Sequence, residues 1–297
     1  MRKSSVYLPD ALKEALAAFA QASGRSEADL IREAIEHLVA PAPDPSSPIS
    51  RARRVLTGPC LIGVGVGPGN PDLITERALD VLHQADRVIA LSTGTDAIPR
   101  AEMTIRVAAP TVRVDRIALA IAGTAAERAT SLAAVAAELV AALDVRHVVA
   151  VVTVGDPNVY SIFSGLARAV HAARPSIGID TVPGVMAFQD LAARTQTVLA
   201  DAGDHLGIVT ASEDLAALDP YLADPRCTVV IYKGGRYLPA IADRLAKCDR
   251  LDGAVMGELL GLPGEHHGTV SAIADRPASY LAAIVVPATR SRPTGPT

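Results

Sequence analysis

The sequence contains no tryptophan, and aromatic residues make up only 3% of its 297 residues. Hydrophobic residues nevertheless account for 49% of the chain, so its core must consist mainly of alanine, valine, leucine and isoleucine. This composition excludes a chain that is disordered over most of its length, because disordered segments are poor in apolar residues. Aliphatic cores are typical of α/β folds, in which buried parallel strands read as runs of valine and isoleucine.

Cysteines and long apolar runs are also scarce. Cys60, Cys227 and Cys248 lie far apart without the spacing of a metal site, which favours reduced thiols. No apolar run has the length of a transmembrane helix, and Lys13 and Glu14 interrupt the segment where a signal peptide would need apolar residues. A net charge of −4 argues against chain-wide affinity for nucleic acid. We therefore expect a cytoplasmic protein that does not bind membranes.

A proline-rich stretch, residues 41–48, divides the chain. Its prolines alternate with alanine, aspartate and serine, a composition that can neither continue a helix nor join a sheet. We expect a linker at 41–58, which separates a small module at 1–40 from the rest of the chain.

The module at 1–40 shows one alternating stretch followed by two amphipathic helices. The first helix is expected to start at Asp10, and Ser26 and Asp29 form a capping-box-like start for the second. Such a unit buries too little surface alone and should need a partner chain. The pattern resembles the ribbon-helix-helix family, in which the strands of two chains pair into one ribbon.

That resemblance implies a DNA-binding surface. The outward residues Lys3, Ser5 and Tyr7 would enter the major groove, and Arg25-Ser26 would meet a phosphate through its amides. The module holds five basic and six acidic residues, however, a net charge of −1. Two hypotheses therefore remain for it, DNA binding and dimerisation alone.

From residue 60 onward, strand and helix patterns alternate. This rhythm predicts mostly parallel sheets with helices on their faces, and a ligand at the carboxyl ends of the strands. We expect two α/β subdomains, at 59–176 and 177–288, and a disordered tail at 289–297. Strands are expected at 60–66, 87–91, 147–154, 177–182, 205–210, 227–232, 254–257 and 281–286, and helices at 73–84, 125–143, 159–173, 185–194 and 237–247.

Four loops rich in glycine and proline follow predicted strands. We name them the first loop (63–71), the second loop (153–161), the third loop (182–187) and the fourth loop (230–235). The first loop fails as a dinucleotide-binding fingerprint because Pro68 or Asn70 stands where the third glycine is required. It also lacks the lysine of a phosphate-binding Walker loop. The interpretation that is left is a glycine-rich loop at the end of a strand, where a large flat ligand can approach the backbone.

In this order, the four loops resemble those of the tetrapyrrole methylases, the class III S-adenosylmethionine-dependent methyltransferases. The segments 155–163, 187–194 and 258–265 are most similar to the precorrin-2 C20-methyltransferases of cobalamin biosynthesis. The resemblance implies two α/β domains, a homodimer, a tetrapyrrole substrate, and S-adenosylmethionine as methyl donor, which leaves as S-adenosylhomocysteine.

The resemblance also implies site residues. Cofactor contacts would come from the four loops and one later glycine: Pro68, Gly155, Asp156, Pro157, Val159, Tyr160, Pro183, Gly184, Met186, Ala187, Tyr232, Lys233 and Gly261. The substrate would lie against the first loop and nearby basic residues: Gly65, Gly67, Gly69, Asn70, Arg77 and Arg236, with Lys233 as a further candidate partner for its carboxylates.

No catalytic base is predicted, because methyl transfer is an in-line displacement at an activated sulfonium and depends chiefly on positioning and water exclusion. Asn70, Met186-Ala187 and Tyr232 depart from the usual family residues, which leaves room for an altered substrate preference. Two alternatives stay open beside C20 methylation of precorrin-2 or its cobalt form. One is a methylase acting at another tetrapyrrole position. The other is a DNA-binding regulator whose methylase-like domain senses S-adenosylmethionine or a corrinoid intermediate.

No metal site is predicted, since His266-His267 lacks a third ligand nearby and is typical of a surface loop.

Overall fold

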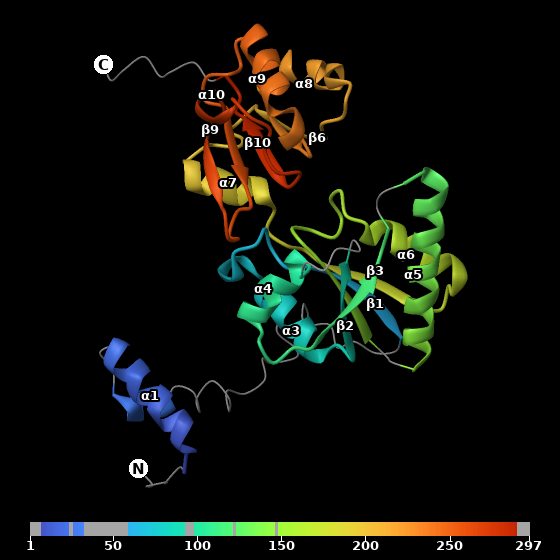
Figure 1. The fold of residues 1–297 in the computed structure, drawn as a ribbon, viewed down its shortest axis with the longest axis vertical. Helices are drawn as coiled ribbons and strands as arrows, with labels where there is room; N and C mark the ends of the chain where they lie inside the picture. The colour runs from blue at the N-terminus through green and yellow to red at the C-terminus, as the bar shows by residue number, and fades with distance from the viewer. Residues whose placement is uncertain are drawn as a thin grey trace. The chain divides into compact units, whose positions relative to one another are not determined.

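The computed structural model describes residues 7–23, 26–32, 59–92, 98–120, 123–145 and 148–289. The chain divides into two compact units, residues 1–55 and 56–297 (Figure 1). The predicted linker at 41–58 lies outside the described residues, and so does the predicted tail at 289–297 except for its first residue. Lys3, Ser5 and Arg25 of the predicted DNA-binding surface also lie outside them.

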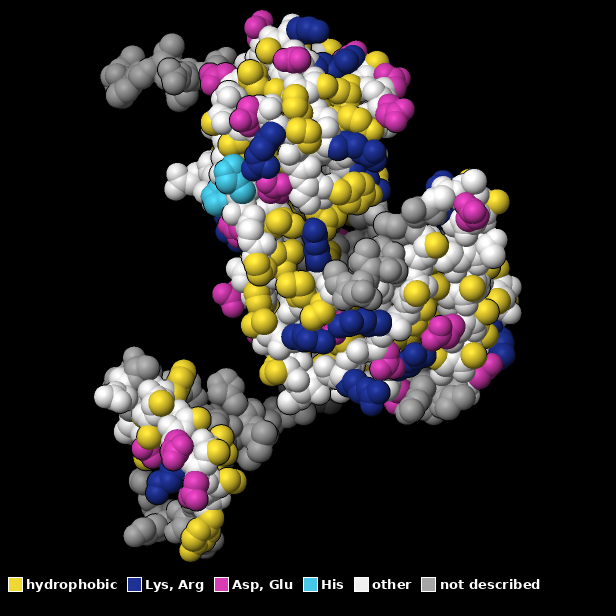
Figure 2. Space-filling model, viewed as in Figure 1, with side chains coloured by type: hydrophobic (Ala, Val, Ile, Leu, Met, Phe, Trp, Pro, Cys, Tyr) yellow, Lys and Arg dark blue, Asp and Glu magenta, His cyan; other side chains and the backbone are white. Residues whose placement is uncertain are grey.

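Unit 1–55 contains helix α1 (Asp10–Ser23) and a helical segment at 27–32. The Ser26 hydroxyl accepts a 3.1 Å hydrogen bond from the Asp29 amide, which confirms the predicted cap. On α1, Leu12 and Phe19 are exposed. Figure 2 shows hydrophobic side chains on the visible surface of this unit. Exposed apolar side chains on so small a unit agree with the expectation that it needs a partner chain.

The described residues of unit 56–297 form two five-stranded sheets. The first sheet has the strand order β3-β2-β4-β1-β5, and all of its strand pairs are parallel. Its strands are β1 (Cys60–Gly65), β2 (Arg87–Ser92), β3 (Val114–Ala118), β4 (Val148–Thr153) and β5 (Gly178–Val182). Its helices are η2 (Pro71–Leu73), α3 (Glu76–Gln84), α4 (Arg100–Ala108), α5 (Ala125–Val145) and α6 (Phe163–Ala173).

Alternate residues of the first sheet enter two separate cores, as the period of two along a strand requires. Ile62 and Val64 of β1 face one core with Ile105 of α4, and α3 covers the same face. Leu61 of β1 faces the other core, which Leu139 of α5 and other side chains of α5 and α6 close. Figure 1 shows these helix pairs on opposite faces of the sheet. This layering leaves the carboxyl ends of the strands open for the loops.

The second sheet has the strand order β6-β7-β10-β8-β9. Its strands are β6 (His205–Thr210), β7 (Cys227–Tyr232), β8 (Val255–Glu258), β9 (His266–Thr269) and β10 (Ala282–Val286). Its helices are α7 (Ala187–Thr195), η3 (Leu215–Leu218), α8 (Asp219–Leu222), η4 (Gly235–Tyr237), α9 (Leu238–Lys247) and α10 (Val270–Ile273). Helix α7 packs on one face with Phe188 and Leu191, and α9 covers the other with Ile241 and Leu245.

The prediction of mostly parallel sheets holds for the first sheet and is wrong for the second. Only β6 and β7 pair in parallel there, and the pairs β7–β10, β10–β8 and β8–β9 are antiparallel. The segment 259–265 that joins β8 to β9 is too short for the crossover of about a dozen residues that a parallel pair needs.

The boundary between the two sheets also lies later in the chain than expected. From the sequence, the second subdomain was expected to begin at residue 177, directly before β5. In the structure, β5 pairs with β1 and so belongs to the first sheet. Elements α4, β3 and β9 were not predicted, because none of them carries a long periodic pattern. Among the described residues, none of the helices combines the length and the apolar character needed to span a membrane.

Candidate active site

The loops that follow β1, β4 and β5 contact one another at the carboxyl end of the first sheet. The Gly155 amide donates a 2.8 Å hydrogen bond to the Gly67 carbonyl, and the Gly184 amide donates a 3.1 Å bond to Oδ2 of Asp156. Strands β1 and β4 are neighbours, so their loops emerge side by side. The first, second and third loops therefore form one continuous backbone surface.

Gly65 and Gly184 allow that surface to form. A Cβ atom on Gly65 would lie 2.7 Å from the Gly184 amide nitrogen, and one on Gly184 would lie 2.9 Å from Cα of Gly65. No side chain tolerates such distances from backbone atoms. These two positions require glycine because two loops approach each other at backbone contact.

The Asp156 carboxylate is used within the loops. Its Oδ1 accepts a 2.8 Å bond from the Asn158 amide, and its Oδ2 accepts the bond from Gly184. Asp156 does not line the pocket described next. Its role in this structure is to hold the second and third loops together.

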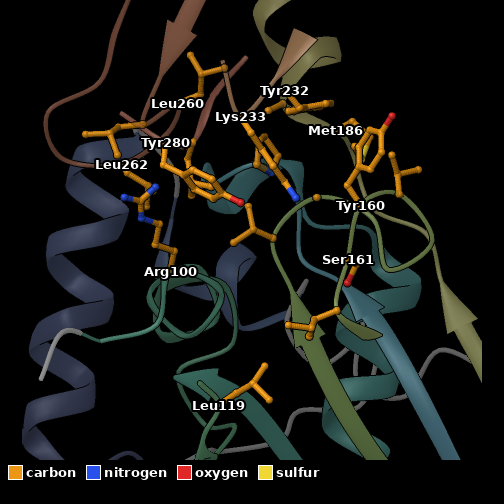
Figure 3. A pocket seen from close by; sticks show the side chains of 18 of the residues that line it. Arg100, Leu119, Tyr160, Ser161, Met186, Tyr232, Lys233, Leu260, Leu262 and Tyr280 are labelled. Carbon is orange, nitrogen blue, oxygen red and sulfur yellow. The ribbon is translucent and has the colours of Figure 1, made fainter. Parts of the chain in front are cut away.

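A pocket of about 660 Å³ opens beside these loops (Figure 3). Its volume is in the range of small-molecule sites. It is lined by residues from both sheets' loops and from α4 and α5: Pro68, Arg100, Leu119, Ala120, Arg128, Ala129, Leu132, Val154, Gly155, Val159, Tyr160, Ser161, Ile162, Met186, Ala187, Tyr232, Lys233, Leu259, Leu260, Leu262, Tyr280 and Leu281.

The backbone at this pocket is strained. Tyr160, Lys233 and Leu259 all have positive φ angles, of 49°, 60° and 55°. Residues other than glycine rarely adopt this conformation, and where they do the cost of order 1–3 kcal/mol is concentrated at functional sites. All three residues line the pocket, which marks it as the candidate active site.

Charge in the pocket has one sign. Among the described residues that line it, Arg100, Arg128 and Lys233 are basic and none is acidic. The Arg128 Nη1 donates to the Gly123 carbonyl at 2.5 Å, and the Lys233 Nζ lies 6.0 Å from the centre of the Tyr160 ring. The remaining lining is mostly apolar. The pocket therefore suits a large apolar ligand that carries negative charge.

Aromatic side chains form one wall. The rings of Tyr160 and Tyr232 meet edge to face with their centroids 6.3 Å apart, and the centroids of Phe188 and Tyr232 are 6.5 Å apart, also edge to face. The Tyr232 hydroxyl accepts a 3.3 Å bond from the Phe188 amide at the start of α7. Burial raises the pKa of Tyr232 to about 12, and the Phe188 amide partly offsets that rise. Tyr232 therefore presents a neutral hydroxyl at physiological pH.

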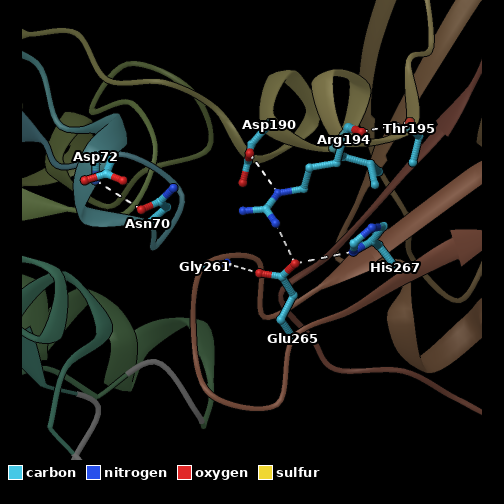
Figure 4. A network of polar contacts seen from close by, with 9 residues as sticks. Asn70, Asp72, Asp190, Arg194, Thr195, Gly261, Glu265 and His267 are labelled. Atoms are coloured by element: carbon cyan, nitrogen blue, oxygen red, sulfur yellow. Dashed lines mark hydrogen bonds and ion pairs between the residues drawn. The ribbon is translucent and has the colours of Figure 1, made fainter.

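A polar network supports the loop that carries Leu260 and Leu262 (Figure 4). Glu265 Oε2 accepts a 2.7 Å bond from the Gly261 amide, and its Oε1 accepts a 2.6 Å bond from Nη1 of Arg194. The Nε of Arg194 in turn donates a 2.9 Å bond to Asp190, and His267 Nδ1 lies 3.3 Å from Glu265. Gly261 itself packs against the backbone of Asn70. The network therefore fixes this loop against the first loop.

Comparison with known proteins identifies the family. Residues 60–274 match the profile of the family described as Tetrapyrrole (Corrin/Porphyrin) Methylases. The chain belongs to this family. Residues 5–40 match the profile of ribbon-helix-helix proteins of the copG family. Both resemblances stated from the sequence are confirmed, and so is the α/β methylase fold.

Individual proteins similar to this tetrapyrrole methylase are themselves methyltransferases that act on tetrapyrroles, as their names state. The precorrin-2 C(20)-methyltransferase of a Sinorhizobium species is 30% identical over 246 residues, which cover 78% of this chain and 97% of that protein. The cobalt-precorrin-2 C(20)-methyltransferase of Salmonella typhimurium is 29% identical over 233 residues, which cover 76% of this chain and 95% of that protein. The structure of a Thermus thermophilus uroporphyrin-III C-methyltransferase complexed with S-adenosylhomocysteine is similar in fold, with a TM-score of 0.54, 18% identity, and coverage of 77% and 92%.

The methylase brings most of the predicted cofactor residues together. Those that line the pocket are Pro68, Gly155, Val159, Tyr160, Met186, Ala187, Tyr232 and Lys233. Those that lie in or beside the same loops without lining it are Asp156, Pro157, Pro183, Gly184 and Gly261.

Apart from Lys233, which lines the pocket, the residues predicted to contact substrate lie elsewhere. Gly65, Gly67, Gly69 and Asn70 shape the first loop, and Asn70 Oδ1 caps η2 by accepting a 3.1 Å bond from the Asp72 amide. Arg77 lies on α3, and the exposed Arg236 stacks 5.2 Å from the Tyr237 ring. None of these residues lines the pocket. They stay predictions for a substrate surface beyond it.

Sequence reasoning missed the end of the pocket formed by α4, β3 and α5. Arg100, Leu119, Arg128 and Leu132 come from this part of the chain. No glycine-proline loop marks these positions, and α4 and β3 were not predicted at all. The only available signal was a basic residue directly after Pro99, at a helix start.

Tyr7 is 96% exposed, the state expected of a contact residue in the N-terminal module. His266 and His267 lie exposed on strand β9, so their assignment to a surface loop is wrong, although their exposure is as expected. The part of the chain that the structure describes contains no group of three residues that could hold a metal ion.

Proposed function

We propose that this tetrapyrrole methylase transfers a methyl group from S-adenosylmethionine to C20 of precorrin-2 or its cobalt form. The pocket supports this proposal most directly, because it lies at the carboxyl ends of parallel strands and is lined mostly by apolar side chains. Its described lining includes basic residues and no acidic one. A tetrapyrrole is a large apolar ring with carboxylate substituents, so it matches both properties. Two C(20)-methyltransferases among the relatives, each covered over more than nine tenths of its length, support the position.

The residues of the pocket suit S-adenosylmethionine at one end. Gly155 and Pro68 present backbone without bulky side chains, and Met186 and Ala187 offer apolar surface next to the neutral hydroxyl of Tyr232. When bound there, S-adenosylmethionine would supply an activated methyl group on its sulfonium. The chain's own contribution is to bind, orient and exclude water, which agrees with a pocket that has no acidic side chain among its described lining.

A titration and an assay test this proposal. Calorimetry with S-adenosylhomocysteine should give one site per chain. Gly155→Val should abolish it, because a φ of 70° is strained for valine and its Cβ atom would lie 3.3 Å from the Met186 sulfur, which lines the pocket. Wild-type protein supplied with S-adenosylmethionine and precorrin-2 should then form a product one methyl group heavier. Binding without methylation of either precorrin-2 form would rule out the C20 proposal, and product analysis would reveal methylation at another tetrapyrrole position.

A second candidate function is supported by the N-terminal match to ribbon-helix-helix proteins. In that case the chain would be a DNA-binding regulator whose methylase unit senses S-adenosylmethionine or a corrinoid intermediate. The exposed Leu12 on α1 and the exposed Tyr7 are consistent with a second copy pairing at this module. A mobility-shift assay on the gene's own upstream region tests the idea. A salt-sensitive shift that Tyr7→Ala weakens would support it, and no shift at low salt would dismiss it.

A further inference from the structure

Arg100 stands out among the basic residues of the pocket. Its Nη1 atom is buried and has no hydrogen-bond partner in the described part of the chain. By contrast, Arg128 donates to the Gly123 carbonyl, and Lys233 lies against the Tyr160 ring. A buried guanidinium nitrogen without an acceptor costs free energy that a ligand can recover.

The position of Arg100 is held by its helix. Arg100 is the first residue of α4, and the Thr104 hydroxyl on the same helix lies 3.2 Å from the Gly69 carbonyl, to which it can donate. The buried Glu102 accepts bonds of 2.6 and 2.9 Å from Arg116 on β3. Since Glu102 is occupied by Arg116 and Arg106, it does not neutralise Arg100. The helix is thus fixed to the first loop and to β3.

None of the described residues that line the pocket with Arg100 is acidic. Figure 3 shows its side chain reaching toward the part of the pocket where Leu262 and Tyr280 lie. Leu119 and Leu132 line the same pocket. Burial lowers the pKa of the Arg100 guanidinium, the effect expected when a cation is kept from water without a compensating anion.

We propose that Arg100 binds a carboxylate substituent of the tetrapyrrole substrate and so sets the position of the ring in the pocket. This rests on the proposed function, because it takes the ligand to be a tetrapyrrole. The planar guanidinium can hold a carboxylate through two parallel hydrogen bonds, while Leu119 and Leu132 contact the apolar ring. Arg100 is a specificity-determining residue for substrate, and it makes no contribution to cofactor binding.

The test compares three variants with the wild type. Arg100→Gln removes the charge, Arg100→Lys keeps the charge without the fork, and Arg113→Gln is the control, since Arg113 is 93% exposed and does not line the pocket. Thermal melting and calorimetry with S-adenosylhomocysteine verify that each variant folds and keeps its cofactor site. The probe is uroporphyrin, whose ring substituents all end in carboxylates, measured by fluorescence beside a porphyrin with neutral polyether substituents.

Arg100→Gln should weaken uroporphyrin binding by about 10- to 100-fold, the loss expected for one charge-assisted hydrogen-bonded pair. Arg100→Lys should recover part of that loss, and Arg113→Gln should bind as the wild type does. Affinity for the neutral porphyrin and for S-adenosylhomocysteine should not change. In the methylation assay, KM for the tetrapyrrole should rise by a similar factor while KM for S-adenosylmethionine stays the same.

Two results would overturn the proposal. The first is that Arg100→Gln binds uroporphyrin as tightly as the wild type does. The second is that the wild-type protein binds S-adenosylhomocysteine but does not bind uroporphyrin. The proposed function fails separately: if uroporphyrin binds through Arg100 yet precorrin-2 is never methylated, the carboxylate site stands and the methyltransferase assignment does not.

Discussion

The hydroxyl of Tyr160 donates a 2.7 Å hydrogen bond to the backbone carbonyl of Ile208. Tyr160 belongs to the second loop, after β4 of the first sheet, and Ile208 lies on β6, an edge strand of the second sheet. The same tyrosine lines the pocket and has a φ angle of 49°. A strained pocket residue therefore joins the two sheets directly.

Tyr160→Phe should loosen this connection without removing the ring. We expect the free energy of unfolding to fall by about 1 kcal/mol, the usual net value of one hydrogen bond. Affinity for S-adenosylhomocysteine should fall several-fold, because the second loop loses its anchor on β6. Urea unfolding and calorimetry measure the two effects. Unchanged values for both would show that the bond to Ile208 contributes nothing.

Gly184→Ala should damage the site at its backbone. The new methyl group would lie 2.9 Å from Cα of Gly65 and would push the first and third loops apart. We expect a loss of about 1–3 kcal/mol in stability, as for overpacking, with at least about tenfold weaker cofactor binding. Gly165→Ala on α6 is the control, since its Cβ would contact only Leu132, at 3.5 Å. Equal behaviour of the two variants would contradict the close approach of the loops.

Glu265→Ala should release the loop around Gly261. The substitution removes the acceptor of the Gly261 amide and the partner of Arg194. We expect affinity for S-adenosylhomocysteine to drop about fivefold, equivalent to about 1 kcal/mol. Glu213→Ala, at an exposed position, serves as the control. If calorimetry finds both variants indistinguishable from wild type, the network in Figure 4 does not support the pocket.

Tyr232 should make the protein sensitive to alkali. Burial raises its pKa to about 12 in the folded chain, whereas an unfolded chain ionises tyrosine near pH ~10. The contribution of the neutral phenol to stability is therefore complete below pH ~10 and is lost as the pH rises toward about 12. Tyr232→Phe lacks this titration, so its unfolding free energy should fall less steeply with pH over that interval. Urea unfolding across the interval checks this, and identical slopes would refute it.

Much of the fold could be predicted because its local signals were strong. Strands β6 and β7 were expected at 205–210 and 227–232, where apolar runs end in turn residues, and the structure has them at those positions. Strand β9 was missed because the sequence of 266–269, two histidines followed by glycine and threonine, has no apolar alternation. Antiparallel pairing in the second sheet also escaped prediction, since pairing depends on contacts distant in sequence.

The site could be predicted only where it consists of loops with distinctive residues. Gly155 and Met186 lie in such loops, and both line the pocket. Asp156 was expected to touch the cofactor, yet its carboxylate bonds the Asn158 and Gly184 amides, a partnership that only the fold reveals. Arg100 lay beyond prediction because its importance comes from burial without a partner, and a sequence does not display burial of a single side chain.

An isotope-labelling assay tests whether the protein methylates C20. The protein is supplied with S-adenosylmethionine carrying an isotope-labelled methyl group, together with precorrin-2 or its cobalt form, and the product is examined by mass spectrometry and NMR. We expect one labelled methyl group at C20 and a rate that depends on the pocket residues Gly155 and Tyr160. A label at any other carbon would contradict the assigned position. No label in either substrate, from protein that binds S-adenosylhomocysteine, would contradict the assignment as a C20-methyltransferase.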